Sequence, residues 1–436
     1  MRKQILFFIL FTISGSFTQA QTLDDYLVMA GENNPELKAY YQEYLAALEK
    51  APQVGTLPDP ELNAGIFFSP MERFMGNQVA DIRLMQMFPW FGTLDSRKEA
   101  ANLQAEARYQ MFLDAKNQLF YEVKSTWFEL YRIQKEIEIN RENLEYLKEY
   151  ERLALVKYSS STSQSSSDMS MPNTSSNMSS SGTQMSDVLR IRMQYLELNN
   201  SILTLEDQLI PLQIKFNQLL NRDINSEISS VDTLEPGKLL ADKMALLDSI
   251  QVSNPKLAKF DAEYAALEQE ERIARLEGRP MLGAGIDYMP FQPRPEGNMM
   301  MGGMDMVMPM VSISLPIYRK KTNSKIKETE LLREATLLRK EKEENLLAME
   351  WANAIRDLEN ASRKIQLYQE QKEIAEQTLK LVTTSFTANG NGLEDVLAVQ
   401  QQLLDFQLKE IKAIVLQHQS LAKLESLVSS EISPLN

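Results

Sequence analysis

Apolar positions alternate with polar or small ones in four short segments of the chain, at about 60–69, 79–88, 281–289 and 307–316. In the second segment Ile82 and Leu84 share one parity, while Asp81 and Arg83 share the other. A period of two residues indicates β-strands with one apolar and one polar face. Such faces suit a strand between lipid and a watery lumen, and they equally suit a half-buried soluble hairpin. The alternation therefore predicts strands and leaves their surroundings open.

Two much longer segments, 94–158 and 320–387, contain no Pro and no Gly. An unbroken helix of roughly 65 residues is roughly 100 Å long. The segment that follows in each half repeats apolar residues every seven positions, as coiled coils do. These residues are Leu196, Leu203 and Ile210 in the first half, and Leu397, Leu404 and Ile411 in the second, where His418 continues the series as an expected core residue. The pattern predicts a tube or stalk of long packed helices.

The chain is also an internal duplication. Asn-Pro-Glu-Leu at 34–37 recurs as Asn-Pro-Lys-Leu at 254–257, and Asp-Val-Leu at 187–189 recurs at 395–397. Each half is predicted to contain a helix, two strands, a very long helix, a loop and another helix. We divide the chain into a signal peptide at 1–20, a first repeat at 21–220, an equatorial linker at 221–238 and a second repeat at 239–436.

The expected fold is mainly α with a small β part, with four membrane β-strands and a long α-helical hairpin bundle in each protomer. Four strands cannot close around a lumen, whereas three copies supply twelve. If the strands are membrane strands, we therefore expect a trimer that forms a 12-stranded β-barrel on a 12-helix α-barrel.

The first twenty residues have the pattern of a secretory signal peptide. Arg2 and Lys3 precede the apolar run 5–13, and small residues stand before Gln21, so we expect cleavage there and export to the envelope. The sequence holds no Cys, which excludes lipid attachment at a mature N-terminal Cys, disulfides and thiolate chemistry.

Charge and motifs exclude several classes of function. The formal net charge of -14 argues against nucleic acid as a partner. No later stretch approaches 18 consecutive apolar residues, so no transmembrane helix is expected. The sequence shows no nucleophile–base–acid set, no Gly-rich phosphate loop and no His/carboxylate cluster. We expect neither an enzyme nor a bound cofactor.

With these features the chain resembles the TolC-like family of outer-membrane efflux proteins, nearest to its copper/silver cation efflux branch. The resemblance rests on the duplication, the Asn-Pro-x-Leu segments, the paired strand-Pro landmarks at 87–91 and 314–318, and Phe-x-x-Asn-Gly-x-Gly-Leu-Glu-Asp-Val-Leu at 386–397. It implies a homotrimer in the lipid of the cell outer membrane that extends into the periplasm. It also implies two protein partners, a periplasmic adaptor and an inner-membrane pump of the RND type.

The resemblance further implies a periplasmic gate at the helical tip. Asp187 and Asp395 correspond to the family's acidic position there, where a trimer would form rings of carboxylates suited to cations. One turn further on, where some members carry another Asp, this chain has Arg190 and Ala398. Each Asp can equally be a first-turn acid that the helix dipole favours.

The two halves differ in length at two places, and both places are rich in methionine. A Ser/Met-rich insertion at 159–186 belongs to the predicted tip, and a Met-rich loop at 297–310 joins two predicted strands at the opposite mouth. The candidate metal ligands are Met169, Met171, Met178 and Met185 in the insertion, and Met299, Met300, Met301, Met304, Met306, Met308 and Met310 in the loop.

Thioethers are soft ligands that suit Cu(I) and Ag(I). We therefore expect a passive exit duct of a tripartite efflux system that carries Cu(I) or Ag(I) as transient cargo. Methionine is also an adaptable hydrophobe, and a Ser-rich tract can be low-complexity filler. Two alternatives consequently stay open: the same duct exporting drugs or other organic solutes, and a periplasmic coiled-coil metal-binding scaffold without a barrel.

Overall fold

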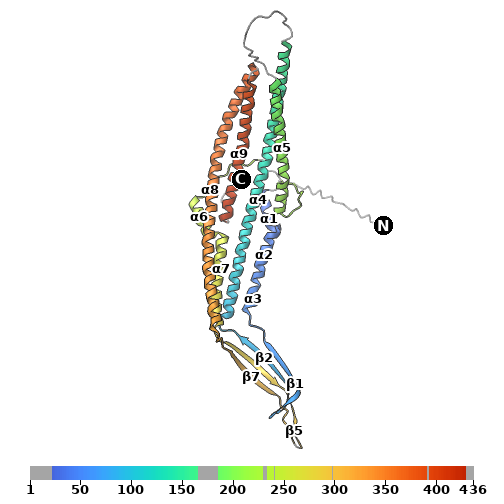
Figure 1. Ribbon diagram of the computed structural model, residues 1–436, viewed down its shortest axis with the longest axis vertical. Coiled ribbons are helices and arrows are strands. Elements are labelled where there is room, and N and C mark those ends of the chain that lie inside the picture. Colours follow the sequence, from blue (N-terminus) through green and yellow to red (C-terminus); the bar gives the residue numbers. More distant parts are fainter. Residues whose placement is uncertain are drawn as a thin grey trace, which may run out of the picture.

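The protein is long and narrow, with a β-sheet at one end and the ends of four long helices at the other (Figure 1). The computed structural model describes residues 22–164, 185–228, 233–239, 241–296, 298–389 and 392–428. Two helices run along most of the molecule, and shorter helices pack beside them. The expected fold class, mostly helical with a small sheet, is confirmed.

The two repeats have matching element orders. The first contains α1 Leu23–Asn33, α2 Pro35–Leu48, α3 Lys50–Gly55, β1 Glu61–Arg73, β2 Gly76–Phe88, α4 Thr93–Gln164 and α5 Met185–Leu219. The second contains α6 Lys243–Ser253, α7 Pro255–Glu277, β3 Met281–Met289, β7 Met306–Ser314, α8 Arg319–Asn389 and α9 Leu393–Val428. Three short strands lie between β3 and β7: β4 Phe291–Gln292, β5 Arg294–Glu296 and β6 Met299–Met301.

The two segments that the sequence assigned to loops are shorter in the structure. The helix α4 continues to Gln164, six residues into the expected Ser/Met-rich insertion, because extending a formed helix costs far less than starting one. In the expected loop 297–310, Met299–Met301 pair with β5 and β7 already begins at Met306. The alternation of Met306, Met308 and Met310 continues the strand pattern that follows them.

The four main strands form an antiparallel sheet in the order β1-β2-β3-β7, so that the repeats meet at the β2–β3 pair. Leu62, Leu84, Ile286 and Pro309 form one row across all four strands. This side, which we call the apolar face, is exposed in the protomer: Leu62 is 67% and Ile286 is 54% accessible.

The neighbouring row across the sheet is of a different kind. It consists of Asn63, Arg83, Asp287 and Met308. Because directly paired residues project to the same side and successive residues to opposite sides, this row defines the polar face. The sheet is thus two-faced, as the alternation predicted.

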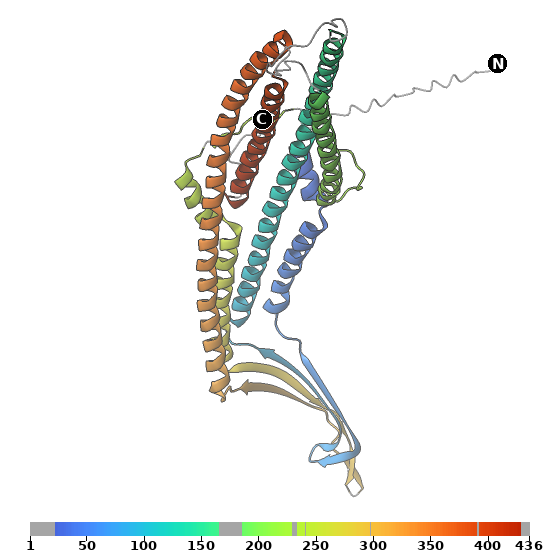
Figure 2. The ribbon, with the colours of Figure 1, turned by 45° about the horizontal axis from the view of Figure 1, so that its top comes forward.

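Shorter helices pack end to end along each of the two long helices, α4 and α8. In Figures 1 and 2, α2, α3 and α5 lie along α4, while α7 and α9 lie along α8. An apolar core at the middle contains Tyr26, Phe128 and Phe216, and a second core contains Ile191 and Val396. None of the helices in the described ranges is long and apolar enough to cross a membrane.

The duplicated Asn-Pro segments perform the same task in both repeats. Asn34 accepts a hydrogen bond from Leu37 N at 3.0 Å and so caps α2, while its amide donates to Leu219 O at 3.2 Å. Asn254 likewise caps α7 and donates to Leu427 O at 2.8 Å. Each side chain therefore starts one helix and satisfies a carbonyl at the end of another.

The segment between the repeats crosses the middle of the helical part. Leu234 N donates to Tyr131 Oη at 3.0 Å, and His418 Nε2 lies 2.7 Å from Glu235 O. A Cβ on Gly237 would lie only 2.8 Å from Leu421 Cδ1, so the backbone packs directly on α9. His418 is 8% exposed and is a core residue, as the heptad position predicted.

Candidate functional site

Both expected site regions lie at the ends of the molecule. At the helical end, α4 and α8 finish and α5 and α9 begin. Lys157 of α4 donates to the backbone carbonyl of Phe386 of α8, and its Nζ lies 4.2 Å from the centre of the Phe386 ring. Arg190 of α5 forms an ion pair with Glu394 of α9. We call this end the tip. The Lys157 contact joins α4 to α8, and the ion pair between Arg190 and Glu394 joins α5 to α9.

Asp187 and Asp395 occupy equivalent positions at the tip. Each stands in the first turn of its helix, where the macrodipole favours an acid. A Cβ on Gly392 would lie 3.4 Å from Asp395 Oδ2, so this carboxylate is next to the start of α9. Gly392 has a φ of 89°, which suits glycine. In this position Asp395 stabilises the start of α9, and its side chain remains exposed. A ring of carboxylates across a trimer stays a prediction.

The methionines of the tip insertion lie mostly outside the described residues. Met169, Met171 and Met178 fall in 165–184, and nothing about their placement enters the description. Met185 is the first residue of α5 and is 47% exposed. Of the four expected tip ligands, the structure therefore locates one.

The methionines of the opposite end fall into two groups. Met299, Met300 and Met301 form β6, and they are exposed together with Met304. Met306, Met308 and Met310 belong to β7 and pair with Met289, Asp287 and Gly285, so they share one side of the sheet. The structure thus separates an exposed hairpin from a row of strand residues, a division that the expected single loop did not contain.

Two further methionines on the same face were missed in the sequence. Met85 pairs with Gly285, and Met87 pairs with Gly283, which places both on the polar face. The strand parity already placed Asp81 and Arg83 opposite Ile82 and Leu84, so the same parity could have identified them. They were missed because they stand outside the conspicuous Met run.

The polar face also carries an ion pair. Arg83 Nη2 lies 3.2 Å from Asp287 Oδ2, and the Asp287 side chain is fully buried. A buried carboxylate needs such a partner, because burial of an unpaired charge costs several kcal/mol. Within the described ranges, His, Asp and Glu side chains form no group of three or more that could hold a metal ion.

Comparison with known proteins identifies the architecture. A family model described as outer membrane efflux protein matches residues 246–430. No curated protein matches the sequence. The solved structure of the outer-membrane channel OprN has a TM-score of 0.72 with this chain at 15% identity, covering 94% of this chain and 90% of OprN.

Two other solved structures are similar over the same extent. The outer membrane protein VceC from the bacterial pathogen Vibrio cholerae has a TM-score of 0.72 at 14% identity, covering 94% of this chain and 96% of VceC. CusC, whose structures were solved to follow conformational changes accompanying folding and transmembrane channel formation, has a TM-score of 0.74 at 13% identity. The match covers 94% of this chain and 92% of CusC.

The family match covers most of the second repeat, and nearly the whole chain has the fold of these channels. Over residues 246–430 the matching family model agrees with the expected family. The finer assignment to a copper/silver branch goes beyond what the family match and the shared fold carry.

Proposed function

We propose that three copies of this chain form the exit duct of a tripartite efflux system in the outer membrane. The sheet lies in the lipid, and the helices extend into the periplasm as a tunnel. The duct conducts passively, without catalysis, while an inner-membrane pump of the RND type supplies the energy. A periplasmic adaptor joins pump and duct at the tip.

The observation that carries this proposal is the exposed apolar face of the sheet. Large apolar side chains on β1, β2, β3 and β7 cover it, with Ile66 at 76% and Val311 at 80% accessible. Soluble proteins rarely expose a contiguous apolar surface of this kind, which marks an interaction with lipid or protein. The opposite face is polar, as the wall of a watery lumen requires.

Two apolar stripes on the helices support assembly of copies. Leu196, Leu203 and Ile210 of α5 are more than half exposed, although their seven-residue spacing predicts a helical partner. Leu367, Ile374 and Leu381 of α8 have the same spacing and are also exposed. Different surfaces that meet between copies give a heterologous interface, which closes into a ring of three when each copy is rotated by a third of a turn.

The duct is tested by extracting the full chain from membranes in mild detergent. The proposal expects a trimer that migrates as a compact species in an unheated gel sample and as a monomer after boiling. A soluble periplasmic monomer would overturn the duct and favour the coiled-coil scaffold. The presence of the adaptor in a crosslinked sample, attached near the tip, tests the partner separately.

The proposed cargo is Cu(I) or Ag(I). Soft thioethers stand at the hairpin 299–304 and in the tip insertion, and they suit these ions without deprotonation. Replacing the Met of both segments by Leu preserves volume and removes sulfur, so copper tolerance should fall. The matched control replaces Met111 and Met349, two helix residues, by Leu. Unchanged copper tolerance in the first variant would rule out Cu(I) or Ag(I) as the cargo and favour organic solutes.

A further inference from the structure

Five methionines gather on the polar face of the sheet, separate from the exposed hairpin. Met85 and Met87 of β2 share this face with Met306, Met308 and Met310 of β7. The same face carries the Arg83–Asp287 ion pair and two serines of β7. Methionine normally fills gaps in apolar cores, and this face is not such a core.

The sulfurs of Met85 and Met87 approach one point above β3. A Cβ built on Gly283 would lie 2.7 Å from Met87 Sδ and 3.3 Å from Met85 Sδ. On Gly285 a Cβ would lie 3.1 Å from Met85 Sδ. The absence of side chains at these two positions therefore provides the space in which the two thioethers meet.

A hydroxyl from the next strand completes the cluster. Ser312 Oγ lies 3.8 Å from Met85 Sδ and 3.7 Å from Met87 Sδ, and it donates to these sulfurs. Both methionines are half-buried, so they stand on the surface of the face and can be reached from it. The hydroxyl orients the sulfurs toward a common point and leaves their remaining lone pairs available.

Met310 is placed to supply a third sulfur. It stands in the same cross-strand row as Met85, with only Gly285 between them. Neighbouring strands are about 4.8 Å apart, so the two Cα atoms are separated by roughly 10 Å. Because no side chain intervenes, the two long thioether side chains can extend toward each other across β3.

We infer that Met85, Met87 and Met310 form a thioether site for a soft monovalent cation, Cu(I) or Ag(I), on the polar face of the sheet. Neutral sulfur ligands bind such ions by softness and offer no charge to stabilise a divalent ion such as Zn(II). The site's place in the lumen rests on the proposed function, since the polar face lines the lumen only in the closed trimer.

The test measures Ag(I), which avoids copper redox chemistry, on the purified full-length protein in detergent. The background carries Leu at the hairpin and tip-insertion methionines, so that the strand methionines are the sulfurs at issue. The inference expects Ag(I) binding by titration calorimetry, sulfur neighbours in Ag X-ray absorption, and no competition by Zn(II). Zn(II) that displaces Ag(I) would overturn it.

Two variants, M85L/M87L and G283A, test the site in different ways. M85L/M87L removes two ligands, and affinity should fall by more than the roughly tenfold that loss of one supporting group costs a metal site. G283A keeps every sulfur but places a Cβ 2.7 Å from Met87 Sδ and closer still to Ser312 Oγ, so it displaces both groups and should weaken Ag(I) binding as well. The controls are M111L/M349L and G65A, whose Cβ meets nothing closer than 4.0 Å. Equal Ag(I) binding in M85L/M87L and the controls would overturn the site.

Trimer assembly, measured on the same preparations, separates this inference from the proposed function. A trimer that retains unchanged Ag(I) binding in both variants removes only the thioether site. A chain that purifies as a soluble monomer removes the duct, whatever its Ag(I) binding. The expected result is a stable trimer in all variants, with weaker Ag(I) binding in M85L/M87L and G283A alone.

Discussion

At the scale of single residues, the duplicated asparagines have the clearest role. Asn34 and Asn254 are buried, and each uses its carbonyl oxygen as an N-cap and its amide as a donor to a carbonyl of α5 or α9. Leucine could fill the same space, but it could not satisfy two helix ends. The chemistry of the amide explains why this residue type recurs in both repeats.

Replacing Asn254 by Ala should lower the free energy of unfolding by about 1–2 kcal/mol, because it removes a cap and leaves the Leu427 carbonyl without its donor. Asn254→Asp keeps the acceptor but sets a second carboxylate oxygen against Leu427 O in a buried place, so it should cost at least as much as the alanine variant. Thermal melting followed by helical circular dichroism measures both. Equal melting of wild type and Asn254→Ala would contradict the double role.

His418 gives the molecule a dependence on pH. Burial lowers its pKa below the ordinary 6.5, although its contact with Glu235 O and the charge of Glu425 oppose this shift. Below pH 6.5 the unfolded chain takes up a proton that the folded chain binds less readily. Stability should therefore be fully present above pH 6.5 and decline as pH falls through the lowered pKa.

The His418→Gln variant isolates this contribution, because glutamine does not titrate. Between pH 7.5 and 5.5 the wild type should lose more thermal stability than the variant does, as measured by the melting temperature in detergent. Parallel pH profiles of the two proteins would show that His418 contributes nothing to the acid sensitivity.

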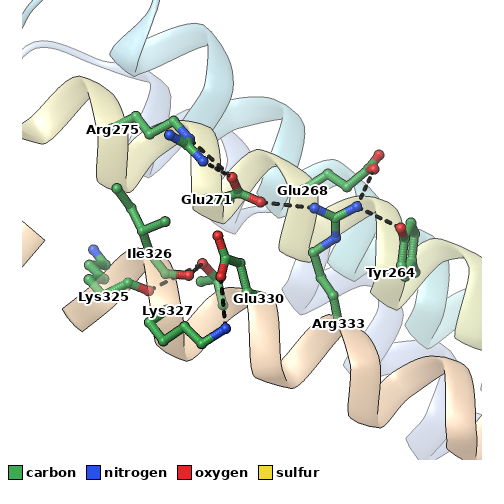
Figure 3. A network of polar contacts seen from close by, with 10 residues as sticks. Tyr264, Glu268, Glu271, Arg275, Lys325, Ile326, Lys327, Glu330 and Arg333 are labelled. Carbon is green, nitrogen blue, oxygen red and sulfur yellow. Dashed lines mark hydrogen bonds and ion pairs between the residues drawn. The ribbon is translucent and has the colours of Figure 1, made fainter. Parts of the chain in front are cut away.

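At the scale of elements, a polar network joins α7 and α8 near the sheet (Figure 3). Arg333 of α8 donates to Tyr264 Oη at 2.6 Å and to Glu268 and Glu271 of α7, each at 2.8 Å. Arg275 donates to the same Glu271 carboxylate. These contacts fix the relative position of two helices, of which α7 precedes β3 and α8 follows β7 in the chain.

Replacing Arg333 by Met should destabilise the α7–α8 pair by about 1 kcal/mol, since partly exposed ion pairs contribute little each but form a network here. The control Lys327→Met removes an exposed pair with Glu330 within α8 and should cost about 0.3 kcal/mol. Proteolysis rates at the α7–α8 region provide the measurement. A control variant as sensitive as Arg333→Met would refute the network.

The elements themselves followed largely from the sequence. Two-residue alternation located β1, β2, β3 and β7, and the lack of Pro and Gly located α4 and α8, because both signals are local. The strand pairing of Met299–Met301 could not be predicted, since it depends on Arg294–Glu296 lying opposite. The neighbouring turn contributes as well: Gly303 N donates to Met75 O at 2.9 Å, a contact between the two repeats.

At the scale of the whole molecule, the exposed stripes of α5 and α8 predict how copies assemble. Leu203 is 52% and Ile374 is 64% exposed in the protomer. A charge at either position would be buried at the interface between copies without a partner. Leu203→Glu and Ile374→Glu should therefore each reduce the trimer fraction in detergent, measured by light scattering, while the protomer still folds.

The matched control is Gln208→Glu, which adds the same charge at an exposed position on a different side of α5. It should leave the trimer intact. If Gln208→Glu dissociates the trimer as readily as Leu203→Glu, net charge and not the stripe governs assembly.

The sequence by itself determined the long helices and the strands, because each depends on residues close together in the chain, and it determined the duplication, because the two copies can be compared directly. The tertiary structure decided what depends on distant residues. It placed Met85 and Met87 above Gly283, roughly two hundred residues away, and it placed Ser312 against both sulfurs. Strand register alone brings these groups together, since a shift of one residue would turn them to the other face of the sheet.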